Sequence, residues 1–547
     1  MALAARRVRL LFVLFAGLLL LAALRAADLG TLQAAHLSAV GVSHQVISGA
    51  VTPLRGAILD RNGDALALTE PGDDVSAYDV RQPDLAAAKI APLLHESVAS
   101  LAERLAAHRG FQYLARQLPA RTAQRIAALG IGGIRLATDD YRYYPFGALA
   151  GQVLGGVHLS GAGAGGIEQE LNAKLAGRNG DSSTVYAANG TPISVNVARR
   201  PVAGEDVQLT LDAALQQEAE SVLAGVGRTS APVSATAIAL NPNTGAVLAL
   251  ANWPSADPNS PGNGSNWADP ALQLVYEPGS TFKIVAVGGA LADGLISPNT
   301  PFNIPSQLQF DGRTINDSEP HPDETLTTTG IVAQSSNIGA VEIGQMLGAS
   351  RFAAWVGRFG FGARTGIDLP GEEQGIVPPL VNYNNFSMGN LPFGQGESVT
   401  PIQMAAAYAA VANGGVLRTP HVVAAIGGVR RREPAGRRIL TPVVAAQMRR
   451  IFQSVLAPGG TAAEISIPGY TLAGKTGTAN VAVNGTYSRT RFVASFVGFA
   501  PAQHPRIEVE VVVNQPQNGP IYGTDAPAHA WQQIMEWALR YLKIPPS

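Results

Sequence analysis

Residues 276–283 read Tyr-Glu-Pro-Gly-Ser-Thr-Phe-Lys, and the rest of the chain is organised around this stretch. The Pro-Gly pair ends whatever element precedes it, and the apolar run of residues 281–295 predicts a helix. Ser280 then lies in the first turn, and Lys283 follows three residues later on the same face. A serine hydroxyl becomes nucleophilic when a base takes its proton, and a lysine with a lowered pKa can be that base. Ser-x-x-Lys also occurs by chance in many helices, so other motifs must decide.

A second polar motif, Ser-Ser-Asn, stands at residues 335–337. The apolar segment 338–347 behind it predicts a helix, which places Ser335 and Asn337 on a loop or at a helix start, where polar side chains can face a cleft. Taken alone, the motif also fits an ordinary helix N-cap.

A third motif, Gly-Lys-Thr-Gly-Thr, stands at residues 474–478 and is predicted to lie on a strand. Lys475 offers a point charge for a carboxylate, and Thr476 or Thr478 offers a hydroxyl. Gly477 removes a side chain at a position that we expect a ligand to approach closely. A glycine-containing surface strand with one lysine is common, so this motif too is weak alone.

Composition excludes several classes of function. The chain has 547 residues, which suggests about three domains or segments. Its net charge of −1 provides no global basic field for nucleic acid. The absence of cysteine excludes disulfides, thiolate catalysis and Cys-ligated zinc. The nine histidines form no His-x-x-x-His pair, and phosphate-loop and dinucleotide fingerprints are missing, so we expect no metal and no cofactor.

The N-terminus predicts membrane attachment. Three arginines precede an unbroken apolar run, residues 10–24, which Arg25 closes. Its length also suits a cleaved signal peptide, but no clean Ala-x-Ala site follows, which favours an uncleaved anchor. The basic flank stays in the cytoplasm, so the residues from Asp28 onward lie outside it.

Between the anchor and residue 200 the pattern is mixed α and β. A helical pattern continues from residue 28 to about 48, as a stalk. The Asn-Gly pair at 62–63 predicts a hairpin, and helical periodicity marks residues 84–108, interrupted at Pro92, and 119–129. A loose alternation over residues 185–197 suggests strand with a turn at Asn189-Gly190.

After residue 201 the character changes. This part of the chain is predicted to contain a helix at 213–223, a closing helix at 531–542 and several strands. The predicted strands are 207–211, 235–240, 246–251, 493–499 and 507–513. The last two should form an antiparallel hairpin beside the strand of Lys475.

Together the three motifs, in this order, resemble those of the penicillin-binding proteins and class A β-lactamases: Ser-x-x-Lys, Ser-Asp-Asn and Lys-Thr-Gly. The middle motif has Ser336 where that pattern has Asp. Over nearly its whole length the chain resembles a class B penicillin-binding protein. Arg55-Gly56, the run 142–145 (Arg-Tyr-Tyr-Pro) and the run 166–168 (Gly-Ile-Glu) resemble the non-catalytic pedestal motifs of that family. Residues 393–396 (Phe-Gly-Gln-Gly) resemble a segment of its transpeptidase domain.

This resemblance implies an α+β protein with three parts: a cytoplasmic tail and single transmembrane helix at 1–27, an elongated pedestal (dimerisation-type) domain at 28–200, and a transpeptidase domain at 201–547. The last would carry a five-stranded antiparallel sheet flanked by helices, as in serine β-lactamases. It further implies a bacterial inner-membrane protein with its N-terminus inside and its catalytic domain outside. A polytopic glycosyltransferase of the shape, elongation, division and sporulation class is the implied partner.

The resemblance implies a peptidoglycan DD-transpeptidase that cross-links stem peptides ending in D-Ala-D-Ala. Ser280 would be the nucleophile and Lys283 its base, with a pKa lowered partly by Lys475. Ser335 would relay a proton and Asn337 would hold the substrate amide. The terminal carboxylate would bind Lys475 and the strand residues Thr476, Gly477 and Thr478. Backbone amides of Ser280 and Thr478 would form the oxyanion hole, and β-lactams should acylate Ser280.

Alternatives remain at this point. A membrane-tethered carboxypeptidase or β-lactamase would use water as the acceptor, and a non-catalytic cell-wall scaffold would carry a vestigial centre. Glu168-x-x-Leu-Asn matches the deacylation motif of class A β-lactamases, but it precedes Ser280, so we interpret it as structural. The lead-in at 276–279 favours the septal branch of the family over the elongation branch.

Overall fold

The computed structural model describes residues 2–34, 46–107, 110–186, 192–260, 267–483 and 485–547. The chain forms two compact units. The first comprises Met1–Arg55 and Ala176–Gly204, and the second comprises Gly56–Leu175 and Glu205–Ser547. The elements of each unit are described separately below.

The first unit contains the N-terminal helix and a small sheet. Helix α1 (Ala2–Gly30) includes the segment Arg6–Gly30, with a mean hydropathy of 2.5, which is long and apolar enough to cross a membrane. Its 25 residues span about 37 Å, more than the ~30 Å hydrocarbon core. This length fits a membrane-anchored protein, and it exceeds the apolar run recognised in the sequence because the flanking arginines and alanines continue the helix.

The sheet of the first unit has the order β1-β10-β11, with strands β1 (Val46–Val51), β10 (Gly180–Tyr186) and β11 (Pro192–Arg199). The predicted helical stalk is wrong at residues 46–48, because Val46 pairs with Val185 as a strand neighbour far away in sequence. Most of the remaining stalk (35–45) and the turn at Asn189-Gly190 lie outside the described residues.

A small α/β layer occupies residues 72–138 of the second unit. Strands β4 (Gly72–Ala77), β5 (Gln112–Pro119) and β6 (Ile134–Thr138) form an antiparallel sheet in the order β5-β4-β6. It carries three helices: α3 (Pro83–Leu94), α4 (Val98–Ala107) and α5 (Ala120–Ala127). The break predicted at Pro92 falls later, at His95, whose φ of 56° ends α3 in the left-handed region.

A six-stranded sheet in the order β21-β20-β12-β2-β3-β7 joins residues 58–143 to residues 207–430 of this unit. Its strands are β2 (Ile58–Leu59), β3 (Ala65–Glu70), β7 (Tyr141–Tyr143), β12 (Val207–Leu209), β20 (Val423–Ile426) and β21 (Val429–Arg430). The predicted hairpin is confirmed, since β2 pairs with β3 around the Asn-Gly turn.

The pedestal motifs meet beside this sheet. Arg142 donates from Nε to Glu168 Oε1 at 2.7 Å and from Nη1 to the carbonyl of Gly56 at 2.8 Å. Tyr144 donates its hydroxyl to the same Glu168 oxygen at 3.3 Å. Because Arg142 and Glu168 form a buried ion pair, Glu168 has the structural role that its position in the sequence indicated.

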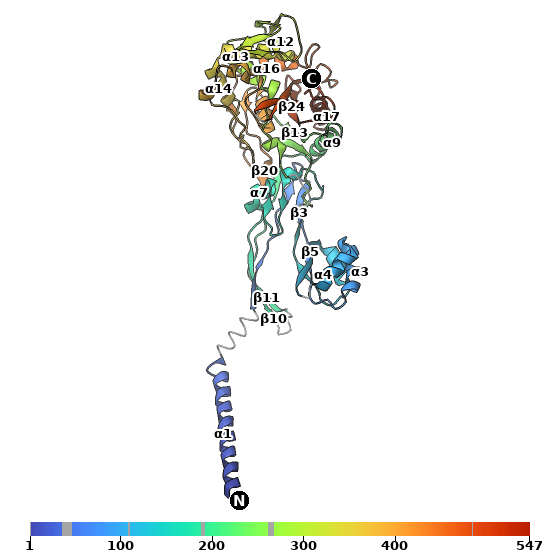
Figure 1. Ribbon diagram of the computed structural model, residues 1–547, viewed down its shortest axis with the longest axis vertical. Coiled ribbons are helices and arrows are strands. Elements are labelled where there is room, and N and C mark those ends of the chain that lie inside the picture. Colours follow the sequence, from blue (N-terminus) through green and yellow to red (C-terminus); the bar gives the residue numbers. More distant parts are fainter. Residues whose placement is uncertain (1, 35–45, 108–109, 187–191, 261–266, 484) are drawn as a thin grey trace. The chain divides into compact units, whose positions relative to one another are not determined.

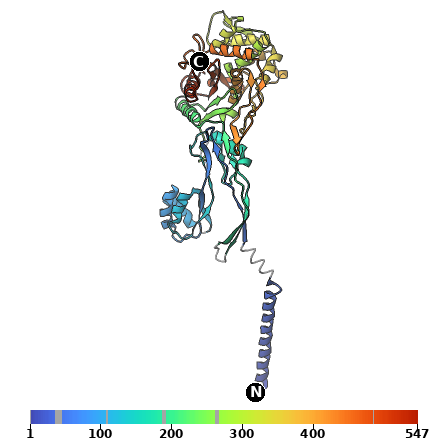
Figure 2. The same ribbon diagram turned by 180° about the vertical axis from the view of Figure 1, so that it is seen from behind.

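The C-terminal part of the second unit is built on a five-stranded sheet in the order β14-β13-β25-β24-β23, with every neighbouring pair antiparallel. The strands are β13 (Ser234–Leu240), β14 (Val247–Trp253), β23 (Ala473–Val483), β24 (Thr486–Ala500) and β25 (Ile507–Asn514). The green β13 lies beside the red C-terminal strands in both views, although the two segments are far apart in sequence (Figures 1 and 2). The sheet and its C-terminal hairpin therefore agree with the prediction.

Helices flank this sheet. Helices α9 (Ala213–Ser230) and α17 (Ala526–Tyr541) pack together and against the sheet, as does α15 (Pro401–Ala412), all of whose residues are buried (Figure 1). The nucleophile segment forms the 3-10 turn η1 (Gly279–Phe282) and continues as α11 (Lys283–Ala292). Helix α11 is buried on every side because its residues are apolar nearly all round.

Further helices and 3-10 turns of the second unit are α6 (Gly151–Leu154), α7 (Gly166–Glu170), α8 (Asn172–Leu175), α10 (Pro270–Gln273), α12 (Thr328–Ala333), α13 (Asn337–Leu347), α14 (Ala349–Arg358), α16 (Pro442–Gln453), η2 (Leu380–Asn382), η3 (Ser387–Gly389) and η4 (Leu391–Phe393). Its remaining strands are short: β8 (Gly156–Val157), β9 (Gly163–Ala164), β15 (Pro301–Ile304), β16 (Leu308–Phe310), β17 (Arg313–Ile315), β18 (Glu324–Thr327), β19 (Val416–Leu417) and β22 (Arg437–Arg438).

Candidate active site

The three motifs meet around one hydroxyl. Lys283 Nζ lies 3.0 Å from Ser280 Oγ and 3.0 Å from Asn337 Oδ1. Lys283 also donates to the carbonyl of Ser335 and contacts its Oγ at 3.2 Å. Lys475 Nζ reaches the same Ser335 Oγ at 2.9 Å. The five side chains predicted to be catalytic therefore form one connected hydrogen-bonded network.

The local backbone positions the nucleophile. Gly279 has a φ of 56°, and a Cβ there would lie 2.7 Å from the carbonyl oxygen of Thr478. Glycine therefore lets η1 pack directly against strand β23. Lys283 starts helix α11, so the 3-10 turn places its side chain beside Ser280.

Burial sets the proton affinity of Lys283. Only 1% of its surface is exposed, and burial lowers its pKa from the ordinary 10.5 to about 7, against the opposing charge of Asp317. The expected contribution of Lys475 is not among the causes of this shift. The pKa of Lys475 is instead lowered well below its ordinary value by burial and, second, by Lys283.

Ser335 lies between the two lysines in an unusual backbone conformation. Its φ of 62° is in the left-handed region, which a serine rarely adopts. In this conformation both its carbonyl and its hydroxyl are presented to Lys283. Since the hydroxyl oxygen can accept from both lysines, its own proton remains available for another acceptor.

The side chain of the neighbouring Ser336 contacts helix α13, whereas that of Ser335 contacts the two lysines. Ser336 is buried and its Oγ accepts from the backbone N–H of Gly339 at 2.9 Å, as the N-cap of α13 (Asn337–Leu347). This N-cap role explains why a serine serves where the family pattern has aspartate.

Asp317 is a site residue that the sequence analysis missed. Its Oδ1 accepts from the backbone N–H groups of Asn337 and Ile338, so it holds the start of α13 in place, and its Oδ2 lies 3.1 Å from His321 Nε2. It lies 20 residues before Asn337 in an irregular loop, where no local spacing would have indicated it.

The strand of the third motif is the edge strand of the sheet, so one row of its backbone groups is free to face η1. Thr476 Oγ1 accepts from Lys475 Nζ at 3.1 Å, and Thr478 Oγ1 accepts from the backbone N–H of Gly523 at 3.0 Å. At Gly477 we expected a ligand to approach closely. The atoms that approach this glycine in the structure belong to the protein chain. A Cβ there would lie 2.4 Å from Ser495 Oγ and 3.0 Å from the carbonyl oxygen of Pro278.

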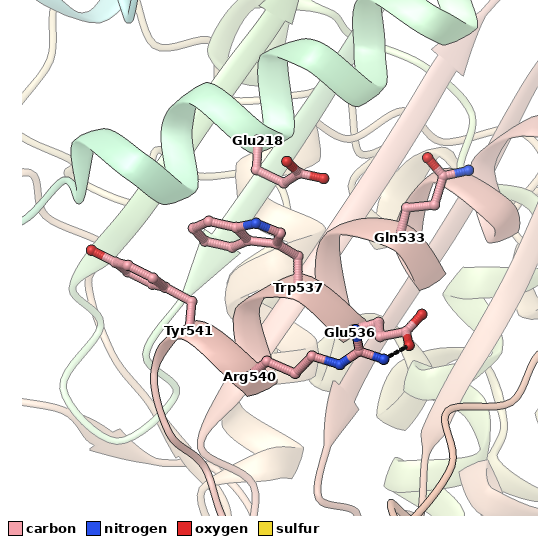
Figure 3. A pocket seen from close by; sticks show the side chains of 6 residues that line it. All are labelled: Glu218, Gln533, Glu536, Trp537, Arg540 and Tyr541. Atoms are coloured by element: carbon pink, nitrogen blue, oxygen red, sulfur yellow. Dashed lines mark hydrogen bonds and ion pairs between the residues drawn. The ribbon is translucent and has the colours of Figure 1, made fainter.

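A large open pocket lies apart from these motifs. It has a volume of about 560 Å³ and lies between α9 and α17, where Trp537 and Tyr541 stack with ring centroids 4.5 Å apart (Figure 3). Arg540 pairs with Glu536 beside them. None of its lining residues belongs to the three motifs, so its volume does not mark the reactive centre.

Among the described residues, no cluster of three or more His, Asp or Glu side chains could hold a metal ion.

Comparison with known proteins identifies the family. The "Penicillin binding protein transpeptidase domain" matches residues 235–536, and the "Penicillin-binding Protein dimerisation domain" matches residues 50–209. The chain is 32% identical to penicillin-binding protein PbpB of Mycolicibacterium smegmatis, over 97% of this chain and 89% of that protein. It is 31% identical to the peptidoglycan D,D-transpeptidase FtsI of Escherichia coli, over 91% of this chain and 85% of that protein.

Solved structures agree with this assignment. Penicillin-binding protein 3 of Mycobacterium tuberculosis, in complex with ampicillin, has a TM-score of 0.73 and 29% identity, covering 91% of this chain and 97% of that one. Its apo form gives a TM-score of 0.72, with coverage of 91% and 98%. With a dimerisation domain, a transpeptidase domain and the three motifs joined around Ser280, this chain belongs to the class B penicillin-binding proteins.

Proposed function

We propose that the protein is a peptidoglycan DD-transpeptidase that works through an acyl-enzyme on Ser280. The observation that carries the proposal is the 3.0 Å contact of Lys283 Nζ with Ser280 Oγ, inside a network that also contains Ser335, Asn337 and Lys475. A buried amine with a pKa of about 7 is suited to act as a general base near neutral pH.

In the first step Ser280 Oγ attacks the carbonyl of the penultimate D-Ala, and its proton passes to Lys283 Nζ. The hydroxyl of Ser335 then gives its proton to the nitrogen of the terminal D-Ala as the C–N bond breaks. Protonated Lys283 restores the proton of Ser335 across their 3.2 Å contact. Free D-Ala leaves, and the base is neutral again.

Binding groups surround this reaction. Backbone N–H groups of Ser280 and Thr478 stabilise the oxyanion, an interaction whose loss typically costs about 3–4 kcal/mol. Asn337 donates one N–H of its amide to the carbonyl of Asn316 at 3.2 Å, which leaves the other N–H for the amide of the substrate. The carboxylate binds Lys475 and the hydroxyls of Thr476 and Thr478, with Gly477 contributing through its backbone.

In the second step an amine of a neighbouring stem peptide attacks the ester carbon. Lys283 takes the amine proton and returns it to Ser280 Oγ as the ester C–O bond breaks, which leaves an amide cross-link. Hydrolysis by water is expected to be slow, because Glu168, which carries the class A deacylation motif in this sequence, is held in the pedestal by Arg142.

Penicillin labelling tests this function. Full-length protein in detergent should form a penicilloyl adduct on Ser280, stable by intact mass, and the Ser280→Ala variant should not. Rapid turnover of penicillin would replace the proposal with a β-lactamase or carboxypeptidase. Equally weak labelling of wild type and variant would indicate a non-catalytic scaffold.

We also propose the division of the chain into an anchor (1–27), a pedestal (28–200) and a transpeptidase domain (201–547). The N-terminal helix remains uncleaved in the inner membrane, with the arginines inside and the catalytic domain outside. Protease treatment of spheroplasts should digest the catalytic domain and spare an N-terminal tag.

The proposed setting is septal wall synthesis with a polytopic glycosyltransferase of the shape, elongation, division and sporulation class as the partner. The sequence of the nucleophile lead-in, 276–279, supports the septal choice. A fluorescent fusion should accumulate at division sites and co-purify the glycosyltransferase, and lateral-wall signal would reverse the assignment.

A further inference from the structure

A second chain segment, residues 394–399, runs beside the nucleophile lead-in and brings two carboxylates together. Tyr276 and Val399 exchange backbone hydrogen bonds of 3.0 and 2.8 Å, and Gly279 N–H donates to the carbonyl of Gly394 at 3.0 Å. Across this pairing, Glu277 Oε1 accepts from the backbone N–H of Gly396 at 3.1 Å. Glu397 follows Gly396 and is therefore placed near Glu277. Glu277 itself lies three residues before Ser280.

A third chain segment closes this acidic site. Tyr487 on β24 donates its hydroxyl to Glu277 Oε1 at 3.0 Å. Tyr487 pairs with Ala482, so the site lies toward the distal end of the same strand β23 that carries Lys475. These contacts place the two carboxylates beside the substrate strand and beyond the nucleophile.

Several polar atoms of this site are buried without a partner in the part of the chain that the structure describes. They are Glu277 Oε2, both carboxylate oxygens of Glu397 and the hydroxyl of Tyr383. Glu397 is only 1% exposed, and burial, followed by the charge of Glu277, raises its pKa well above the ordinary value. A buried carboxyl group without a partner is costly, and such a group in a native site requires an explanation.

The chemistry of these atoms specifies the ligand. Three acidic oxygens match in number the three N–H donors of a primary ammonium, whereas Ca²⁺ takes six to eight oxygen ligands. An ammonium would supply both the missing hydrogen bonds and the opposite charge, and charge-assisted hydrogen bonds are the stronger kind.

The direction of strand β23 specifies the source of this ammonium. In the proposed reaction, a donor peptide with its carboxylate at Lys475 and its reacting carbonyl at Ser280 would lie along β23. The residue that precedes D-Ala-D-Ala would then extend toward Ala482 and Tyr487, which pair at the far end of this strand. We propose that Glu277 and Glu397 form a subsite for the side-chain ammonium of a diamino acid at this position of the donor stem peptide. This inference rests on the proposed transpeptidase function.

Two donor substrates that differ by one ammonium test the subsite. Acetyl-L-lysyl-D-alanyl thioester carries the side-chain amine, and its L-norleucyl counterpart has the same chain without it. For the full-length protein in detergent, kcat/KM for thiol release should be about tenfold to a hundredfold higher with lysine, as expected for one charge-assisted hydrogen bond. In Glu277→Gln and Glu397→Gln the ratio of the two kcat/KM values, lysine over norleucine, should fall to about one.

Controls separate the subsite from the function as a whole. Glu464→Gln, which removes an exposed carboxylate elsewhere on the domain, should keep the full lysine preference. Benzylpenicillin acylation reports whether each variant is folded. If wild type is acylated by penicillin but reacts at equal rates with the two thioesters, the subsite is overturned. This test uses wild type alone, so it holds even if a variant fails to fold. Loss of penicillin acylation in wild type would overturn the proposed function itself.

Discussion

The rate of acylation of Ser280 should follow the titration of Lys283. The free amine is the form that accepts the serine proton, and burial lowers the pKa of this lysine from 10.5 to about 7. For a pKa of about 7, the neutral fraction is about 1% at pH 5, about 9% at pH 6, about 50% at pH 7 and about 91% at pH 8. Acylation should therefore rise about 50-fold between pH 5 and pH 7 and at most about twofold above that.

The assay is the second-order rate of acylation by benzylpenicillin, from pH 5 to pH 9, followed by intact mass after rapid quenching. The hydrogen bond with the carbonyl of Pro322 raises the pKa of His321 above its ordinary value, and His321 lies beside Asp317, so it needs a control. The His321→Asn variant should keep the inflection near pH 7. In Lys283→Arg the base stays charged at every pH, so the rate should drop by about 10²–10⁴ and the inflection should vanish.

Two results would refute this reasoning. A rate that is constant from pH 5 to pH 8 would show that no group with a pKa near 7 controls the nucleophile. A rate that keeps rising tenfold per pH unit toward pH 10 would show that Lys283 retains the proton affinity of an exposed lysine.

Three further variants probe other parts of the structure. Ser335→Ala removes the hydroxyl shared by the two lysines and should lower the acylation rate by about 10²–10⁴, whereas unchanged acylation would exclude the proton relay. Gly477→Ala places a Cβ 2.4 Å from Ser495 Oγ and should destabilise the domain by about 1–3 kcal/mol in urea unfolding, with Ser495→Ala restoring part of the loss. Glu168→Gln leaves the buried Arg142 without its counter-charge and should cost about 3–5 kcal/mol of stability, yet the lifetime of the penicilloyl adduct should not change; a longer lifetime would assign Glu168 to deacylation.

The parts of the fold that were predicted correctly depend on local signals. The turn at residues 241–245 defines the β13–β14 hairpin, and the break at 500–505 defines the β24–β25 hairpin, because turn residues act within a few positions. Asn337 starts helix α13 and Lys475 lies on strand β23, as expected, whereas Ser280 lies in a 3-10 turn before the predicted helix. A helix start and a strand both fix the direction of a side chain. Residues 46–48 were assigned wrongly because their strand partner, β10, is remote in sequence.

The parts of the site that were missed depend on distant contacts. Asp317 acts on Asn337 across a loop, and Glu397 meets Glu277 only because residues 394–399 pair with the nucleophile lead-in. The left-handed conformation of Ser335 has no signature in the residue type, since a serine seldom adopts it. Gly477 was recognised as a position of close approach, but only the structure showed that the approaching atoms belong to the chain.

The reactivity of the centre follows from the core of the domain more than from its charges. Helix α11 is surrounded by apolar residues, and its first residue is Lys283, so packing of the helix also removes the amine from water. This desolvation lowers the pKa, and the single opposing carboxylate, Asp317, limits how far it falls. Asp317 also caps α13 and so fixes Asn337 beside the same amine. One carboxylate therefore influences both the proton affinity of Lys283, the proposed base, and the position of the Asn337 amide, which is proposed to hold the substrate.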